Sequence, residues 1–88
     1  MYHWWVRLLD LNPIWADDGL SFTFNCPLDR GRTVSVVVDG PDGHKVTSPT
    51  RHFAALSLEP SVRGTHHGPN RPCGLHVIIK NGQLLPAN

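Results

Sequence analysis

Turn-forming residues constrain this chain more than any other feature. Its 88 residues include 8 glycines and 8 prolines. Proline removes a backbone donor and ends helices and ladders, and glycine adopts the positive φ angles that tight turns require. Pairs such as Asn12-Pro13, Cys26-Pro27 and Asn81-Gly82 therefore divide the chain into short segments. Long helices are excluded, and residues 1–88 are predicted to form one small domain around a single core.

Alternating side chains between these turns predict antiparallel strands. Leu20, Phe22 and Phe24 alternate with polar residues, as in a strand with one wet face. Residues 33–38 are rich in valine, and two Asp/Gly turn signals follow them, so residues 33–48 are predicted to be a hairpin. Asn81-Gly82 between two apolar runs predicts a type I′ hairpin. The fold class expected is all-β or β-dominated.

The first segment, residues 2–11, allows two interpretations. Its aromatic and β-branched content favours a strand with Trp4 and Val6 on one face. A helix with Trp5 and Leu8 on one side is the alternative, but it would be too short to be stable alone. The strand is the prediction, and Asn12-Pro13 ends it.

Composition excludes two classes of partner. The formal net charge is +1 and charged residues make up 17% of the chain. This charge is too small to create the positive electrostatic potential that non-specific binding of duplex nucleic acid requires. No apolar run approaches the roughly 20 residues that cross a bilayer. Arg7 and Asp10 interrupt any signal-peptide pattern. We therefore expect no membrane association and a cytoplasmic location.

Four pieces of the chain occur in the same order in a known group of proteins. They are LDLNPIW at residues 9–15, FTFNCP at 22–27, LSLEPSV at 56–62 and CGLHVIIKNG at 73–82. In these pieces the chain resembles small uncharacterised phage and prophage proteins, related to a bacterial family of unknown function with zinc-ribbon-like cysteine patterns. The resemblance implies a zinc-ribbon-like or compact β-sandwich architecture and a phage protein in the host cytoplasm. In many relatives Cys-Pro continues into further cysteines, whereas here Asp29 stands in that place.

Two cysteines and a histidine have the character of zinc ligands. Cys73 and His76 have knuckle spacing, and Cys26 follows a predicted strand. A structural zinc would need a fourth ligand, for which Asp29, His66 and His67 are the candidates. The alternative is that Cys26 is a small buried hydrophobe and His76 an ordinary strand residue. A Cys26–Cys73 disulfide is a third reading. The cofactor prediction is thus none, or one structural zinc.

Motifs of catalysis are missing from the sequence. It contains no Gly-x-Ser-x-Gly elbow, no phosphate-binding glycine loop and no His-Glu-x-x-His. Asp17 and Asp18 could act as paired carboxylates, but they precede Gly19 in a predicted turn, where their side chains would bond to the backbone. The chain is therefore predicted not to be an enzyme.

Two segments are candidates for binding a protein partner. Tryptophan and tyrosine are enriched where partners dock, and a small domain can hardly bury every aromatic residue near its N-terminus. The second segment is a polar loop predicted at residues 63–72. The candidate partner-binding residues are Tyr2, Trp4, Trp5, Arg63, His66, His67 and Arg71.

These observations favour a non-enzymatic, phage-encoded accessory protein that binds a host or phage protein. An inhibitor of a host defence complex fits this description, and a homodimer is one expected state. A virion-structural or assembly protein is the first alternative, and it predicts association through strand edges. A metal-dependent enzyme is the second, and it predicts a bound metal with an open coordination position.

Overall fold

A computed structural model describes residues 6–28, 31–41, 43–63 and 75–87 of the chain. Within them the chain forms short strands and one 3₁₀ turn. The elements are β1 (Val6–Arg7), η1 (Leu8–Leu11), β2 (Ile14–Trp15), β3 (Ser21–Asn25), β4 (Thr33–Val37), β5 (Lys45–Val46), β6 (Leu58–Glu59), β7 (Val62–Arg63), β8 (His76–Lys80) and β9 (Gln83–Pro86). All pairs of these strands are antiparallel. The prediction of a β-dominated fold of antiparallel strands is confirmed.

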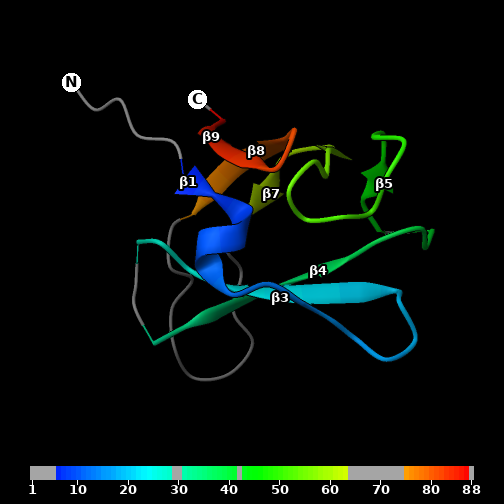
Figure 1. Ribbon diagram of the computed structural model, residues 1–88, viewed down its shortest axis with the longest axis horizontal. Helices are drawn as coiled ribbons and strands as arrows, with labels where there is room; N and C mark the ends of the chain where they lie inside the picture. The colour runs from blue at the N-terminus through cyan, green and yellow to red at the C-terminus, as the bar shows by residue number, and fades with distance from the viewer. Residues whose placement is uncertain (1–5, 29–30, 42, 64–74, 88) are drawn as a thin grey trace.

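One layer is the sheet β2-β3-β4, drawn in the lower part of Figure 1. Phe22 of β3 faces Val36 of β4, and Phe24 faces Val34. All four side chains are buried, whereas Ser35 between the two valines is exposed. The alternation predicted for β3 and the strand predicted over residues 33–38 are therefore confirmed, and one face of this sheet lies against the core.

The second layer is the sheet β1-β9-β8-β7, in the upper part of Figure 1. Strands β8 and β9 form the predicted hairpin, with Lys80 opposite Gln83. Both turn residues have positive φ, 50° at Asn81 and 75° at Gly82, as a type I′ turn requires. Gly82 also lies against the backbone of Ala54, with no room for a Cβ atom.

The two layers share one hydrophobic core. Val77, Ile79 and Leu84 of the upper sheet belong to the same buried cluster as Phe22 and Phe24 of the lower one. Leu8 and Leu11 of η1 join this cluster from the edge, and so does Leu56.

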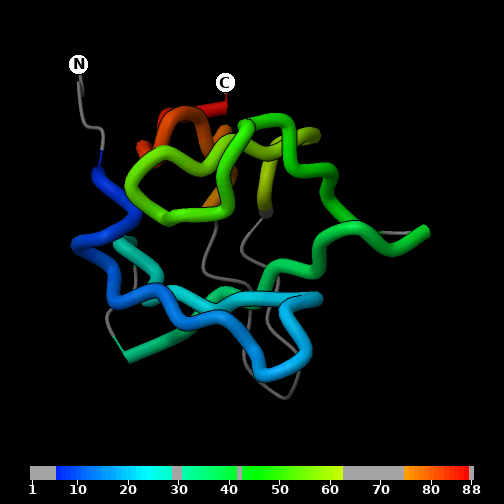
Figure 2. Tube along the Cα trace, turned by 45° about the vertical axis from the view of Figure 1, so that its right-hand side comes forward, coloured from blue at the N-terminus to red at the C-terminus, as the bar shows by residue number. Residues whose placement is uncertain are grey.

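The chain from β4 to β6 passes from the lower layer to the upper one, as the green segment of Figure 2 shows. Strand β5 does not return along β4. It pairs with β6 instead, with Lys45 opposite Glu59 and Val46 opposite Leu58. An isolated bridge between Val38 and His44 is the contact with the end of β4. The predicted hairpin over residues 33–48 is therefore wrong, because β5 finds its partner in β6.

In the described part of the first segment, the predicted strand holds for residues 6–7 and is wrong for residues 8–11, which form a 3₁₀ turn. Val6 and Arg7 pair with β9, as a strand does. The chain then turns into η1, which ends at Asn12 in the left-handed conformation, with φ 53°. Residues 1–5, which include Trp4 and Trp5, lie outside the described residues.

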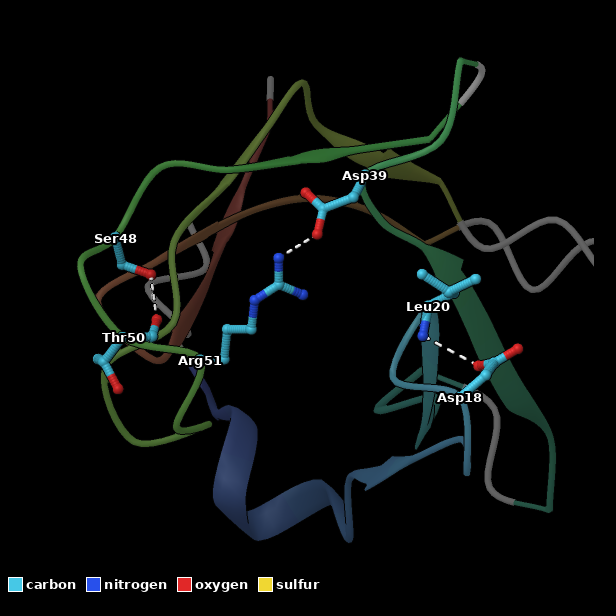
Figure 3. A network of polar contacts seen from close by, with 6 residues as sticks. All are labelled: Asp18, Leu20, Asp39, Ser48, Thr50 and Arg51. Atoms are coloured by element: carbon cyan, nitrogen blue, oxygen red, sulfur yellow. Dashed lines mark hydrogen bonds and ion pairs between the residues drawn. The ribbon is translucent and has the colours of Figure 1, made fainter.

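An aromatic cluster and an ion pair link the lower layer to the segment after β5. Trp15 stacks on Phe53 with ring centroids 5.4 Å apart and meets Phe22 edge-on at 5.1 Å. The guanidinium of Arg51 lies over the Trp15 ring and forms an ion pair with Asp39, which Figure 3 shows. These contacts fasten the residues around Arg51 to the end of β4.

Candidate catalytic site

The ladder between β7 and β8 brings Ser61 next to His76. Val62 pairs with Val77, and Arg63 pairs with His76. Val62 and Val77 are almost fully buried, so they point into the core. Because side chains alternate along a strand, Ser61 and His76 belong to the opposite, outer face. Extending the register by one residue sets Ser61 opposite Ile78, which makes His76 its diagonal neighbour.

These two side chains are in direct contact. The Oγ atom of Ser61 lies 2.8 Å from the Nε2 atom of His76, and both residues are partly buried. The His76 backbone carbonyl accepts a hydrogen bond from Ala87, so ladders on both sides hold the β8 backbone at this position. A serine hydroxyl bonded to a histidine nitrogen is the arrangement that activates serine as a nucleophile.

A second histidine contacts Ser61 from the opposite layer. The Nε2 atom of His44 lies 3.1 Å from the backbone carbonyl oxygen of Ser61. Since a carbonyl oxygen can only accept, Nε2 of His44 carries a proton and donates it. Ser61 is therefore held through its side chain by His76 and through its backbone by His44.

A hollow of about 700 Å³ lies next to the β8–β9 hairpin and is lined by Ile78, two residues from His76, and by Glu59, two residues from Ser61. Its floor includes Ile78 and Leu85, which face each other across the β8–β9 ladder. Ile78 lies two residues from His76, so both occupy the same face of β8. Residues 47–50 and Glu59 form other parts of the wall. The hollow could hold an apolar group of a molecule bound at Ser61.

The predicted metal ligands fall in different environments. Cys26 is 2% exposed and lies in the core cluster directly after β3. His76 is bonded to Ser61 through Nε2. Cys73, Asp29, His66 and His67 lie outside the described residues. Within the described ranges, no group of three or more His, Cys, Asp and Glu residues is placed to hold a metal ion. A structural zinc and a Cys26–Cys73 disulfide stay predictions, and metal content per chain would test the first.

The predicted partner-binding residues fall largely outside the part of the chain that the structure describes. This holds for Tyr2, Trp4, Trp5, His66, His67 and Arg71. The backbone of Arg63 pairs with His76 in the β7–β8 ladder. No helix in the described ranges is long and apolar enough to cross a membrane.

Sequence reasoning missed Ser61 and gave His76 a different role. Ser61 lies between Pro60 and Val62 in no recognised nucleophile motif. One usable signal was the inward pattern of Val62 and Val77: if these two valines pair, Ser61 and His76 must share the outer face. That pairing joins residues 15 positions apart in the sequence. No local sequence pattern predicts it.

Comparison with known proteins gives one finding. No curated protein and no solved structure matches the chain. A family model described as "Bacterial ubiquitination-like system serine protease (BubE)" matches residues 9–87.

This match corrects the predicted function. A serine protease is an enzyme, so the prediction of a non-enzymatic phage accessory protein or host defence inhibitor is wrong. The virion-structural and metal-dependent alternatives are also displaced, since the family is described by serine protease activity. The expectation of a protein partner agrees with it in general terms, because proteases act on proteins. Over 9–87, nearly its whole length, the chain belongs to the BubE family of bacterial ubiquitination-like system serine proteases.

Proposed function

We propose that this protein is a serine peptidase in which Ser61 is the nucleophile and His76 is the general base. The observation that carries the proposal is the 2.8 Å contact between Ser61 Oγ and His76 Nε2. The family described as serine proteases supports it independently.

The proposed roles assign the proton positions. Nε2 of His76 must carry a lone pair to accept the hydroxyl proton of Ser61, so the ring proton of the neutral imidazole lies on Nδ1. The same ring nitrogen faces the serine in Ser-His-Asp hydrolases. Among the described residues, no carboxylate is hydrogen-bonded to the His76 ring. The proposal therefore gives both proton steps to a Ser61–His76 dyad.

The reaction follows from these roles. Ser61 Oγ attacks the carbonyl carbon of the scissile amide while its proton passes to His76 Nε2. The C–N bond then breaks, and His76 gives the proton to the leaving nitrogen, which departs as an amine. The acyl group stays on Ser61 as an ester. Water then attacks this ester while His76 takes its proton; the C–Oγ bond breaks, His76 returns the proton to Ser61 Oγ, and a carboxylic acid and free Ser61 result.

The substrate proposed is a protein of the ubiquitination-like system named in the family description. The dyad lies on the outer face of a sheet, and Ile78, two residues from His76, lines a hollow with an apolar floor. An extended polypeptide could lie across this face with one apolar side chain in the hollow.

Labelling with a fluorophosphonate tests the nucleophile. The probe forms an Oγ–P bond with an activated serine and loses fluoride, and mass spectrometry locates the modified residue. We expect one label, on Ser61. The Ser61→Ala variant should take up none, and His76→Ala should react slower by about two to four orders of magnitude because the base is lost.

Matched variants control for general damage to the protein. Ser35 is exposed on β4 and His52 is exposed beside Arg51. Ser35→Ala and His52→Ala should label at the wild-type rate. Labelling of a serine other than Ser61, or an unchanged rate in folded His76→Ala, would disprove the proposed dyad.

A further inference from the structure

His44 is fixed by its backbone to the end of β4. Its N–H donates to the carbonyl of Val37 at 2.7 Å, and its carbonyl accepts from the N–H of Asp39 at 2.9 Å. These two bonds hold the His44 backbone against Val37 and Asp39. The direction in which the His44 side chain leaves the backbone is therefore set by the lower layer.

Gly43 makes this placement possible. A Cβ atom at position 43 would lie 3.0 Å from the Val37 carbonyl oxygen and 3.0 Å from the Gly40 nitrogen. Such contacts are tighter than nine in ten real Cβ contacts, so the neighbouring backbone would have to move by a few tenths of an ångström. A side chain at this position would push the turn away from β4 and carry His44 with it.

From this turn the His44 imidazole reaches Ser61 in the other layer. Ser61 is 17 residues farther along the chain, and its carbonyl oxygen receives the Nε2–H of His44 at 3.1 Å. Both histidines thus contact Ser61 through Nε2, and in the proposed mechanism their roles are opposite, since His44 donates to the carbonyl and His76 accepts from the hydroxyl.

We infer that His44 is a positioning residue for the nucleophile. The inference rests on the proposed function and names a third residue for the same site. The orientation of the Ser61 carbonyl fixes the peptide plane that follows Ser61, and with it the direction of the Cα–Cβ bond that carries Oγ. His44 also joins the site to the lower layer, so Ser61 is held from both sheets. Small displacements of a nucleophile from its attack geometry cost large factors in rate.

Two substitutions separate the hydrogen bond from the bulk of the ring. His44→Phe keeps an aromatic ring and removes the donor. His44→Gln places an amide N–H near the position of Nε2 and keeps the donor. We expect His44→Phe to lower the fluorophosphonate labelling rate, and kcat for 4-nitrophenyl acetate, by about tenfold to a hundredfold. His44→Gln should restore most of the lost rate, and KM should change little in either variant.

The pH profile distinguishes positioning from proton transfer. If His44 only donates to a carbonyl, the loss of rate on acidification should have the same midpoint in His44→Gln as in the wild type. A shifted midpoint, or a glutamine variant as slow as the phenylalanine variant, would overturn the inference. So would a folded His44→Phe protein that labels at the wild-type rate.

Failure of this inference differs from failure of the proposed function. If Ser61→Ala abolishes labelling and His44→Phe has no effect, the dyad stands and the role of His44 is rejected. If Ser61→Ala still labels, the proposed function falls first. Gly43→Ala gives a second route, because it leaves the imidazole intact and should lower the rate in the same direction by displacing it.

Discussion

Gly82 lies so close to Ala54 that a side chain at position 82 would collide with the Ala54 carbonyl. The Gly82 N–H also donates to the carbonyl of Leu56 at 2.8 Å, and the N–H of Asn81 donates to Ser57 Oγ at 2.8 Å. The β8–β9 turn is thus packed directly onto the segment that leads into β6. Strand β8 carries His76, and the chain beyond β6 carries Ser61, so this packing supports both members of the dyad.

Gly82→Ala should therefore destabilise the protein more than Gly19→Ala does. Both glycines have positive φ, 75° and 71°, so both variants bear a backbone cost of about 1–2 kcal/mol. Gly19 has no atom near its missing Cβ, whereas Gly82 has the Ala54 carbonyl. The clash should add about 1–3 kcal/mol to the loss. Urea unfolding of the two variants measures the difference, and equal losses would contradict the close packing at Gly82.

Ile78 should control which acyl group the site prefers. Its side chain is 39% exposed, and it lines the hollow beside His76. We expect Ile78→Ala to lower kcat/KM for 4-nitrophenyl hexanoate relative to the acetate by about threefold to tenfold, since each buried CH₂ contributes about 0.8 kcal/mol. Val37→Ala, at an exposed valine on β4, is the matched control. A chain-length preference that is the same in wild type and Ile78→Ala would place the acyl group elsewhere.

The rate of labelling should fall as the pH is lowered. A protonated imidazole has no lone pair on Nε2, so His76 cannot accept the proton of Ser61 at acid pH. The change should be reversible on returning to neutral pH. Far-UV circular dichroism over the same range controls for acid unfolding. A rate that stays constant while the protein remains folded would exclude His76 as the base.

The Arg51–Asp39 ion pair should contribute little to stability. Both side chains are well exposed, 49% and 37%, so solvent screens their attraction. A double-mutant cycle with Arg51→Met and Asp39→Asn should give a coupling of about 1 kcal/mol or less, decreasing with salt. Thermal melts at low and high ionic strength measure it. A larger coupling that salt leaves unchanged would show that the pair is effectively buried.

Sequence patterns predicted the parts of the fold that local physics determines. Phe22 and Phe24 alternate with polar residues, and Asn81-Gly82 has the chemistry of a type I′ turn, so these elements were found. The pairing of β5 with β6 was missed because Lys45 and Val46 carry no signal for a distant partner. The two Asp/Gly turn signals suggested instead that this segment pairs with the preceding strand, at residues 33–38.

The residues proposed as catalytic could not be identified from the sequence for the same reason. Ser61 and His76 come from strand segments that meet only through the β7–β8 register. His44, just before β5, reaches Ser61 from a segment that is bonded to the end of β4. Local motifs identify nucleophiles that are held by a single turn, whereas this serine is held by three separate segments of chain.

Strand β7 is only two residues long and lies at one edge of its described sheet. Edge segments with few ladder bonds open more often than the core does. If Val62 and Arg63 leave β8, Ser61 departs from His76 while Val77 and Ile79 keep their places in the core. Catalytic competence and global folding should then have separate temperature limits. On heating, catalytic activity would be lost before the cooperative unfolding transition begins. On cooling, the activity would return without global refolding.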